Sequence, residues 1–147
     1  MSSFQIIVGS MLGGTEYVAE ACQETLESLN HQTKLHLLPD FSQIPSKDQT
    51  WLICTSTHGA GDYPDNILSF VDNLTNTEND LSSVKFLVIG VGDTSYDTFC
   101  YAAKNLTKLL ITKGCKEIVV IKTLDMQQDI DPELESQAWL LANKDQL

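Results

Sequence analysis

The sequence predicts an α/β protein in which a five-stranded parallel sheet has helices on both faces, as a three-layer sandwich. Strand and helix patterns alternate from end to end of the 147 residues, and the strand-length runs are apolar at consecutive positions. Strands of this kind are buried on both faces, which is typical of parallel sheets. Loops rich in Gly, Ser and Thr follow the first, third and fourth runs. Because parallel strands end at one edge of the sheet, these loops should meet there and form a ligand site.

The five strands are expected at runs of β-branched and other apolar residues that turn-forming residues interrupt. The first run ends at Gly9, the second ends at Pro39, and the fourth ends beside Gly92. The expected strands are residues 4–8, 34–38, 50–55, 84–91 and 117–121.

Four helices are expected where apolar residues recur at spacings of three and four. The first begins at Thr15, the second at Pro64, and Gly114 ends the third. The last begins at the capping residue Asp131, which Pro132 follows. Their core faces are expected at Val18, Cys22, Leu26 and Leu29, at Ile67, Leu68, Val71 and Leu74, at Phe99, Ala103, Leu106 and Leu110, and at Leu134, Ala138 and Leu141.

Charge and composition exclude several classes of partner. The chain has 20 acidic residues, nine lysines and no arginine, and its net charge is −11. Nucleic acids and anionic membranes bind clustered basic residues, so neither is expected as a partner. No apolar run approaches the ~18 residues of a membrane-spanning helix, and no signal peptide is expected. The four cysteines are widely spaced and match no zinc pattern. Cys22 and Cys54 fall on apolar faces, which favours buried thiols, and a reducing cytoplasm fits these observations.

The loop of residues 10–15 has the composition of a phosphate site. It precedes the first helix, and a helix N-terminus binds anions through its free amides. Gly13 and Gly14 allow close approach of the backbone, and Ser10 and Thr15 add hydroxyl donors. Without arginine, a phosphate here would be held by amides and hydroxyls. The spacing matches neither a Walker P-loop nor the dinucleotide fingerprint, and the alternative is a glycine turn that only reverses the chain.

The loops of residues 55–62 and 92–100 could form the walls of a site for a planar ring. His58 has no carboxylate and nucleophile at catalytic spacing, so we expect it to line a ligand or, alternatively, to lie exposed in solvent. Tyr96 could stack on a flat ligand or, alternatively, fold back onto the following helix. One phosphate cradle and two walls favour a flat cofactor with a single phosphate group over a dinucleotide.

Three motifs together resemble those of the flavodoxin family. They are Ser10-Met11-Leu12-Gly13-Gly14-Thr15, Ser56-Thr57-His58-Gly59-Ala60-Gly61-Asp62 and Gly90-Val91-Gly92-Asp93-Thr94-Ser95-Tyr96-Asp97-Thr98-Phe99-Cys100. Within the family, the resemblance is closest to the MioC-type single-domain FMN-binding proteins, and the FMN domains of sulfite reductase-type diflavin reductases are also similar. The resemblance implies one flavodoxin-like domain over residues 1–147, with strand order 2-1-3-4-5 and flavin mononucleotide (FMN) as cofactor.

The resemblance also implies a role for each loop. Residues 10–15 would hold the FMN phosphate, residues 56–59 would line the inner face of the isoalloxazine ring with the Gly59 backbone near N5, and Tyr96 would stack on the outer face. Leu12 stands where many members have a hydroxyl residue, and His58 stands where many have an aromatic one. No catalytic residue and no metal ligand is expected. The residues expected to bind FMN are Ser10, Met11, Leu12, Gly13, Gly14, Thr15, Ser56, Thr57, His58, Gly59, Ala60, Gly61, Val91, Gly92, Asp93, Tyr96, Asp97, Phe99 and Cys100.

For function, the resemblance implies a redox carrier rather than a stand-alone enzyme. It would be a cytoplasmic monomer that takes electrons from a separate flavodoxin or ferredoxin reductase-type donor. Its acceptor would be an enzyme with a basic docking face, and the likeness to MioC suggests an acceptor in biotin synthesis. The acidic residues Asp62, Asp65, Asp93 and Asp97 beside the loops would lower the second reduction potential of FMN and attract basic partners.

Two other classes of protein are alternatives to the redox carrier, a signalling receiver and a flavin-free interaction module. A signalling receiver of the same topology needs an acidic cluster after the first strand and an aspartate after the third, but Gly9 and Thr55 stand at these places. A flavin-free interaction module that kept the fold stays open, because Leu12 and His58 depart from the family pattern. Binding of FMN by the purified protein separates this module from the electron carrier.

Overall fold

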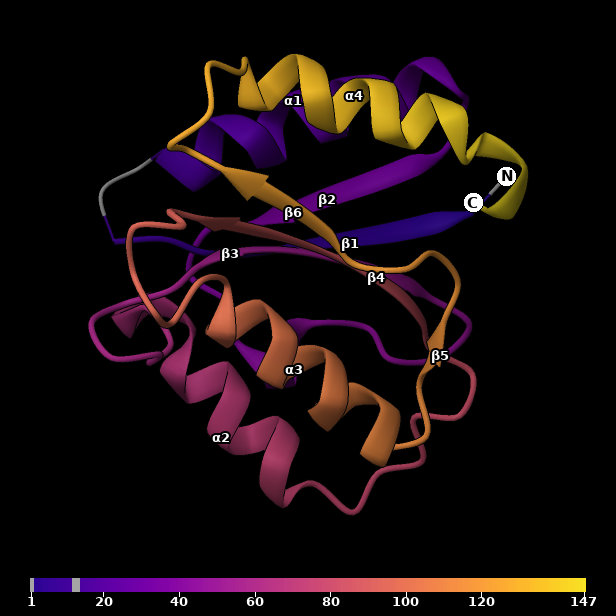
Figure 1. The fold of residues 1–147 in the computed structure, drawn as a ribbon. Helices are drawn as coiled ribbons and strands as arrows, with labels where there is room; N and C mark the ends of the chain where they lie inside the picture. Colours follow the sequence, from indigo (N-terminus) through magenta and orange to yellow (C-terminus); the bar gives the residue numbers. More distant parts are fainter. Residues whose placement is uncertain (1, 12–13) are drawn as a thin grey trace.

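The computed structural model describes residues 2–11 and 14–147, in which a parallel sheet of six strands lies between two layers of helices (Figure 1). The strand order is β2-β1-β3-β4-β5, with β6 also paired to β4, and this confirms the expected order. Helices α1 and α4 cover one face, and α2 and α3 cover the other. The strands are β1 (Ser3–Gly9), β2 (Gln32–His36), β3 (Thr50–Ser56), β4 (Lys85–Gly92), β5 (Lys116–Glu117) and β6 (Lys122–Asp125). The helices are α1 (Gly14–Ser28), α2 (Leu68–Asn76), α3 (Tyr101–Thr112) and α4 (Pro132–Ala142), with short 3-10 turns η1 (Phe41–Gln43), η2 (Asp65–Ile67) and η3 (Lys144–Gln146).

The winding of the chain reverses between β1 and β3, which are neighbours in the sheet. From β1 the chain passes through α1 to β2 on one side, whereas β3 leads through α2 to β4 on the other. Open parallel sheets bind ligands beyond the carboxyl ends of their strands at such a reversal. The loops after β1, β3 and β4 lie at that edge, on the left in Figure 1.

Each face of the sheet has its own apolar core, as the consecutive apolar positions predict. Ile6 belongs to the core beneath α1 and α4 together with Cys22, whereas its neighbour Ile7 belongs to the core over α2 and α3 together with Trp51. Trp51 is fully buried, and its indole N–H donates to the carbonyl of Pro45 at 3.0 Å. All four cysteines are buried free thiols, which confirms the expectation for Cys22 and Cys54.

The expected fifth strand over residues 117–121 is wrong in its bounds. The structure has two short strands, β5 and β6, both paired with β4. Two residues separate Phe86 from Ile89 on β4, but four separate their partners Glu117 and Lys122 on the edge strand. The two additional residues break the alternation of faces, and Val120 is 73% exposed. The apolar run therefore forms a bulge, and the true strand ends later, at Asp125.

The expected core face of the last helix is also wrong. Leu134 and Leu141 are 64% and 48% exposed, whereas Ser136 and Leu140 are fully buried. The side chain of Gln137 donates to the carbonyl of Ala21 in α1 at 3.0 Å. Helix α4 thus contacts α1 through Gln137 and buries a face that includes a serine, and apolar periodicity cannot detect such a face.

Three smaller differences concern element boundaries. Strand β2 begins at Gln32 because its register with β1 starts there, and Leu38 is 82% exposed. The first turn of the helix expected after Pro64 is instead the 3-10 turn η2, and Leu68 is exposed. Phe99 precedes α3 and belongs to the loop. Among the described residues, no helix combines the length and apolar character needed to cross a bilayer.

Candidate cofactor site

Two adjoining cavities lie at the carboxyl edge of the sheet, one of about 510 Å³ and one of about 420 Å³. They adjoin each other and have four lining residues in common, Ser56, Thr57, Val91 and Met126. The larger is also lined by Ser10, Met11, Gly14, Thr15, Tyr17, Val18, His58, Pro132 and Glu133. The smaller is also lined by Gly59, Gly92, Asp93, Tyr96, Thr98, Phe99 and Cys100.

Most of the residues that the sequence predicts at the site line one of these cavities. Ala60, Gly61 and Asp97 lie in the same loops but line neither cavity. Leu12 and Gly13 fall outside the described residues. The structure therefore brings the three predicted loops together at one place, as the topology requires.

The first loop is fixed at its start by a residue that the sequence analysis missed. The side-chain oxygen of Asn66 accepts a hydrogen bond from the Ser10 amide at 2.9 Å. Its amide nitrogen donates to the carbonyls of Val8 and Leu37, at 2.8 and 3.0 Å. Asn66 lies in η2, and nothing in the local sequence marks it as a contact of a strand end 56 residues away.

The end of the larger cavity nearest α1 suits an anionic group. Thr15 is 3% exposed, and a Cβ built on Gly14 would meet no atom within 4 Å. Gly14 and Thr15, in the first turn of α1, line this space. The first amides of a helix have no partner within the helix, and a helix N-terminus attracts negative charge. Among the residues that the structure describes, no lysine lines either cavity, and the chain has no arginine. A phosphate here would rest on amides and hydroxyls, as the composition predicts.

The second loop forms a tight turn that closes on itself. The His58 amide donates to the Asp62 carbonyl at 2.7 Å, and the Asp62 amide donates to the His58 carbonyl at 2.8 Å. Gly59 and Gly61 lie in the left-handed region, with φ of 52° and 106°. The Thr98 hydroxyl donates to the Gly59 carbonyl at 3.4 Å, which links this turn to the third loop. His58 is exposed and lines the larger cavity.

The third loop presents Tyr96 toward solvent beside the smaller cavity. Asp93 accepts hydrogen bonds from the Ser95 amide and hydroxyl at 2.8 and 2.6 Å, and the Tyr96 amide donates to the Asp93 carbonyl at 3.1 Å. These bonds build the turn that carries Tyr96, which is 65% exposed. Hydrogen bonds from the side chains of Ser95 and Gln127 hold the pKa of Asp93 below its usual value. Asp93 is therefore ionised at neutral pH.

Cys100 closes the back of the smaller cavity. It is 1% exposed, and burial raises the pKa of its thiol to about 11. A Cβ built on Gly92 would lie 2.8 Å from the Cys100 sulfur, so this glycine is needed for the approach of the loop to β4. Cys100 thus contributes a neutral, apolar wall.

The sequence analysis also missed the loop after β6. Met126 lines both cavities, and its amide donates to the Gly92 carbonyl at 2.8 Å. Desolvation raises the pKa of Asp125, but hydrogen bonds from Thr94, Gln127 and Gln128 outweigh it and hold that pKa below its usual value. The last strand is expected to end at residue 121, whereas β6 ends at Asp125 and Met126 follows it directly. The capping residues of α4 were the only sequence signal near it.

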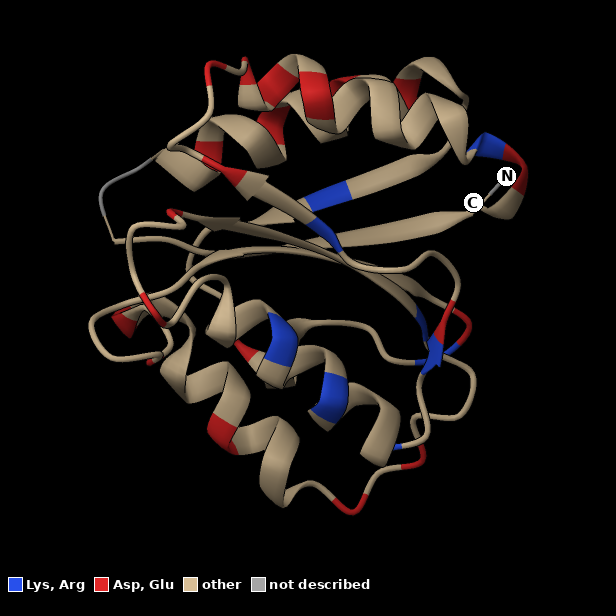
Figure 2. Ribbon diagram, viewed as in Figure 1, with Lys and Arg blue, Asp and Glu red and all other residues tan. Residues whose placement is uncertain are grey.

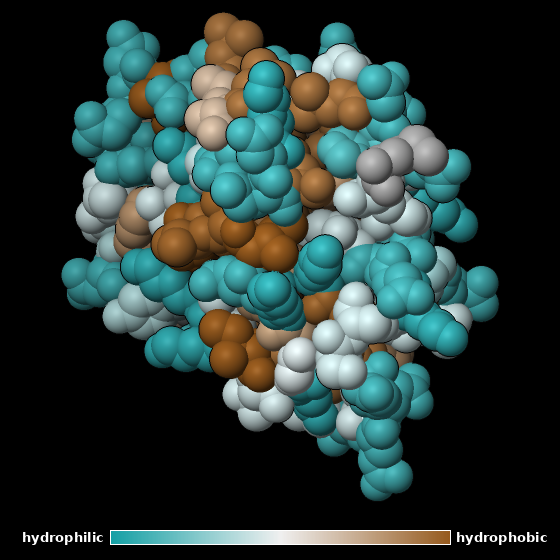
Figure 3. All heavy atoms as spheres, turned by 90° about the vertical axis from the view of Figure 1, so that its right-hand side faces the viewer, coloured by the Kyte–Doolittle hydropathy of each residue, from teal (hydrophilic) through white to brown (hydrophobic). Residues whose placement is uncertain are grey.

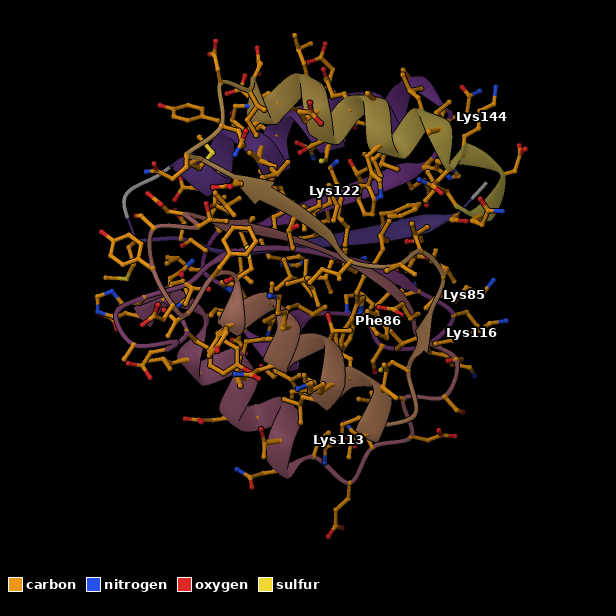
Figure 4. All side chains as sticks on the ribbon, viewed as in Figure 1. Lys85, Phe86, Lys113, Lys116, Lys122 and Lys144 are labelled. Atoms are coloured by element: carbon orange, nitrogen blue, oxygen red, sulfur yellow. The ribbon has the colours of Figure 1, made fainter. Side chains whose placement is uncertain are left out.

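Charge is distributed unevenly over the molecule. Acidic residues surround the cavity edge in Figure 2, whereas Lys85, Lys113, Lys116 and Lys144 lie on the other side (Figure 4). Figure 3 faces the amino edge of the sheet, where a cavity of about 360 Å³ is lined by polar residues and Lys85 without an aromatic wall. The carboxyl edge alone, among the described residues, joins aromatic walls to a helix N-terminus.

These features fit FMN. The smaller cavity has Tyr96, Phe99 and Met126 as walls for a ring, and the larger runs to the start of α1, where a phosphate is favoured. The doubly wound sheet and this site together place the chain in the class of small flavin-binding α/β proteins. The sequence matches the flavodoxin family over residues 6–139, and the chain belongs to this family. Membership implies FMN as the cofactor.

Comparison with individual proteins gives a consistent result. The chain is 42% identical to the MioC homolog of Haemophilus influenzae over 92% of each chain. It is 34% identical to the sulfite reductase [NADPH] flavoprotein alpha-component of Bacillus subtilis, over 92% of this chain and 22% of that protein. A point mutant of flavodoxin from Pseudomonas aeruginosa has a similar structure, with a TM-score of 0.90, 26% identity and coverage of 99% and 98% of the two chains. Both resemblances that the motifs predict, to MioC-type proteins and to sulfite reductase, are confirmed.

Proposed function

We propose that this chain is an electron carrier that binds one FMN across the two cavities, as a single domain over residues 1–147. The observation that carries the proposal is the meeting of the three motif loops around the two adjoining cavities. Bound FMN supplies reversible one- and two-electron chemistry, and the protein supplies orientation and electrostatics. The chain is thus a redox carrier that depends on other proteins for its electrons.

In this proposal each loop has one task. The amides and hydroxyls of residues 10–15 hold the phosphate, and no basic side chain takes part. Tyr96 and Phe99 pack against the ring and exclude water from it, with Cys100 behind. The turn of residues 58–62 places the Gly59 backbone at the rim of the smaller cavity, where it can hydrogen-bond to the ring edge. The residues of the three motifs make up the proposed binding site.

The partners are proposed from charge and exposure. Asp93, Glu133 and the exposed apolar residues Met11, Tyr17 and Met126 surround the cavities. A negative rim around an apolar centre suits a basic partner face, and such steering can accelerate association by about 10–10³-fold at low salt. We propose a flavodoxin or ferredoxin reductase-type donor and an acceptor enzyme that both dock here.

The likeness to MioC proteins alone supports a narrower assignment. We propose that the acceptor is an enzyme of biotin synthesis and that the carrier is a cytoplasmic monomer. Its four free thiols are compatible with a reducing compartment.

Titration with FMN tests the central proposal. The purified chain should be yellow, or it should quench the fluorescence of added FMN with an end point of one equivalent. A protein that does neither overturns the electron carrier and favours the flavin-free module. Steering is tested separately: the rate of reduction by a purified reductase should fall as salt is raised, and a rate independent of salt contradicts the acidic docking face.

A further inference from the structure

Asp125, the last residue of β6, joins the start of the following loop to the loop of residues 92–100 by a bidentate contact. The Thr94 amide donates to one carboxylate oxygen of Asp125 at 3.1 Å, and the Thr94 hydroxyl donates to the other at 2.7 Å. Both oxygens of one side chain are therefore used by one residue of the neighbouring loop. Hydrogen bonds to an ionised acceptor are about twice as strong as neutral ones.

Further contacts complete the connection between the two loops. The Gln127 amide donates to Asp125 at 3.0 Å, and the Gln127 side chain donates to Asp93 at 3.0 Å. The Met126 amide donates to the Gly92 carbonyl at 2.8 Å. Gly92, Asp93 and Thr94 are thus each held by a residue of the segment 125–127. Tyr96 lies two residues after Thr94.

We propose that Asp125 is a positioning residue that holds the loop of residues 93–96 in its FMN-binding conformation before FMN arrives. The inference rests on the proposed function and assigns a role there to a residue outside the three motifs. A loop that is already ordered loses less conformational freedom on binding, and this increases affinity. Asp125 lines neither cavity, so it acts through Thr94 and not by contact with the ring.

The direction in which FMN affinity changes when Asp125 is replaced distinguishes a positioning role from a simple electrostatic effect. FMN carries an anionic phosphate, so removal of a nearby negative charge should by itself strengthen binding. A positioning role predicts the opposite, because the loop that carries Tyr96 loses its support. Asp129 is an exposed acid in the same loop and gives a matched control for charge.

The experiment compares the affinities of Asp125→Ala, Asp125→Asn and Asp129→Ala for FMN and for riboflavin, measured by fluorescence quenching. We expect Asp125→Ala to bind both ligands about tenfold more weakly, the size of effect expected when charge-assisted hydrogen bonds are lost. Asp125→Asn should lie between it and the wild type, because its carbonyl oxygen can still accept from the Thr94 amide. Equal losses for FMN and riboflavin are expected because the defect concerns the ring and not the phosphate.

Hydrogen exchange in the flavin-free protein gives a second readout. The amides of Thr94, Ser95 and Tyr96 should exchange faster in Asp125→Ala than in Asp129→Ala. Affinity of Asp125→Ala equal to or higher than that of Asp129→Ala overturns the proposal, and so does unchanged exchange of these amides. If the wild-type chain binds no FMN, the proposed function fails, and the positioning role for FMN fails with it. Wild-type binding with an unaffected Asp125→Ala variant overturns the positioning role alone.

Discussion

The side-chain oxygen of Asn66 accepts a hydrogen bond from the Ser10 amide at 2.9 Å, across 56 residues of sequence. The same side chain donates to the carbonyls of Val8 and Leu37. Asn66 therefore joins the ends of β1 and β2 to the beginning of the first loop. One side chain therefore satisfies three polar backbone groups near the ends of these strands.

Replacement of Asn66 should weaken the fold at this edge. Asn66→Ala leaves the Ser10 amide and the Val8 and Leu37 carbonyls without this partner, and the free energy of unfolding should fall by about 1–3 kcal/mol. Urea unfolding of the flavin-free protein measures the change. Asn76→Ala, at an exposed position in α2, is the control and should change stability by less than about 0.5 kcal/mol.

A charge at Gly14 should affect phosphate binding without a steric cost. A Cβ at Gly14 meets no atom within 4 Å, and an acid in the first turn suits a helix. Gly14→Asp should therefore fold well but bind FMN more weakly than Gly14→Asn, by about 5- to 10-fold. Riboflavin, which lacks the phosphate, should bind both variants equally. A similar loss for riboflavin would place the phosphate elsewhere.

Tyr96 should contribute through stacking. Tyr96→Ala removes a wall of the smaller cavity and should weaken FMN binding by about 3- to 10-fold, the value of an aromatic pair. Tyr96→Phe keeps the ring and should bind nearly as the wild type does. Fluorescence titration of the two variants is the measurement. Equal affinity of both variants and the wild type would mean that Tyr96 does not face the cofactor.

Asp97 tests the effect of charge on the flavin potential more cleanly than Asp93. Asp93 accepts bonds from Ser95 and Gln127 and supports the loop, whereas Asp97 is exposed and lines neither cavity. Asp97→Asn should raise the second reduction potential, by at most about 60 mV, because a negative charge disfavours the reduced anionic form. Redox titration against a dye measures it. An unchanged or lowered potential contradicts tuning by the acidic rim.

Because of the buried thiol of Cys115, the free energy of unfolding should fall at alkaline pH. Burial raises the pKa of its thiol to about 11 in the folded state, above the value of about 9 in the unfolded chain. Between these pH values the unfolded chain has lost the proton that the folded chain keeps, so the free energy of unfolding falls as pH rises. Urea midpoints at pH 8 and pH 10.5 measure the change. Cys115→Ala, although less stable at pH 8, should lose less stability over this range.

Much of the fold was predictable because its signals are local. Consecutive apolar residues such as Ile6 and Ile7 indicate a strand buried on both faces, and the structure places them in opposite cores. Asp131 and Pro132 mark the start of α4, where the Asp131 side chain caps the amides of Glu133 and Leu134. The three loops follow strand ends, and parallel topology then requires them to share one edge.

The parts that were not predictable depend on contacts between distant segments. The bulge at residues 118–121 arises because β5 and β6 pair with β4 in different registers, and an apolar run carries no sign of this. The bulge moves the strand end to Asp125 and brings Met126 into the site. The burial of Ser136 and the contact of Gln137 with α1 likewise depend on how α4 packs and not on its own periodicity.

The sequence by itself determined the class of fold, the three motif loops, the family and the acidic, arginine-free character of the site. Tertiary structure alone decided which residues support those loops, namely Asn66 behind the first and Asp125 behind the third. The physical reason is that hydrophobic periodicity records which side chains are buried. It does not record which backbone amides and carbonyls remain beyond the ends of the strands, and these groups find their partners only when the chain is folded.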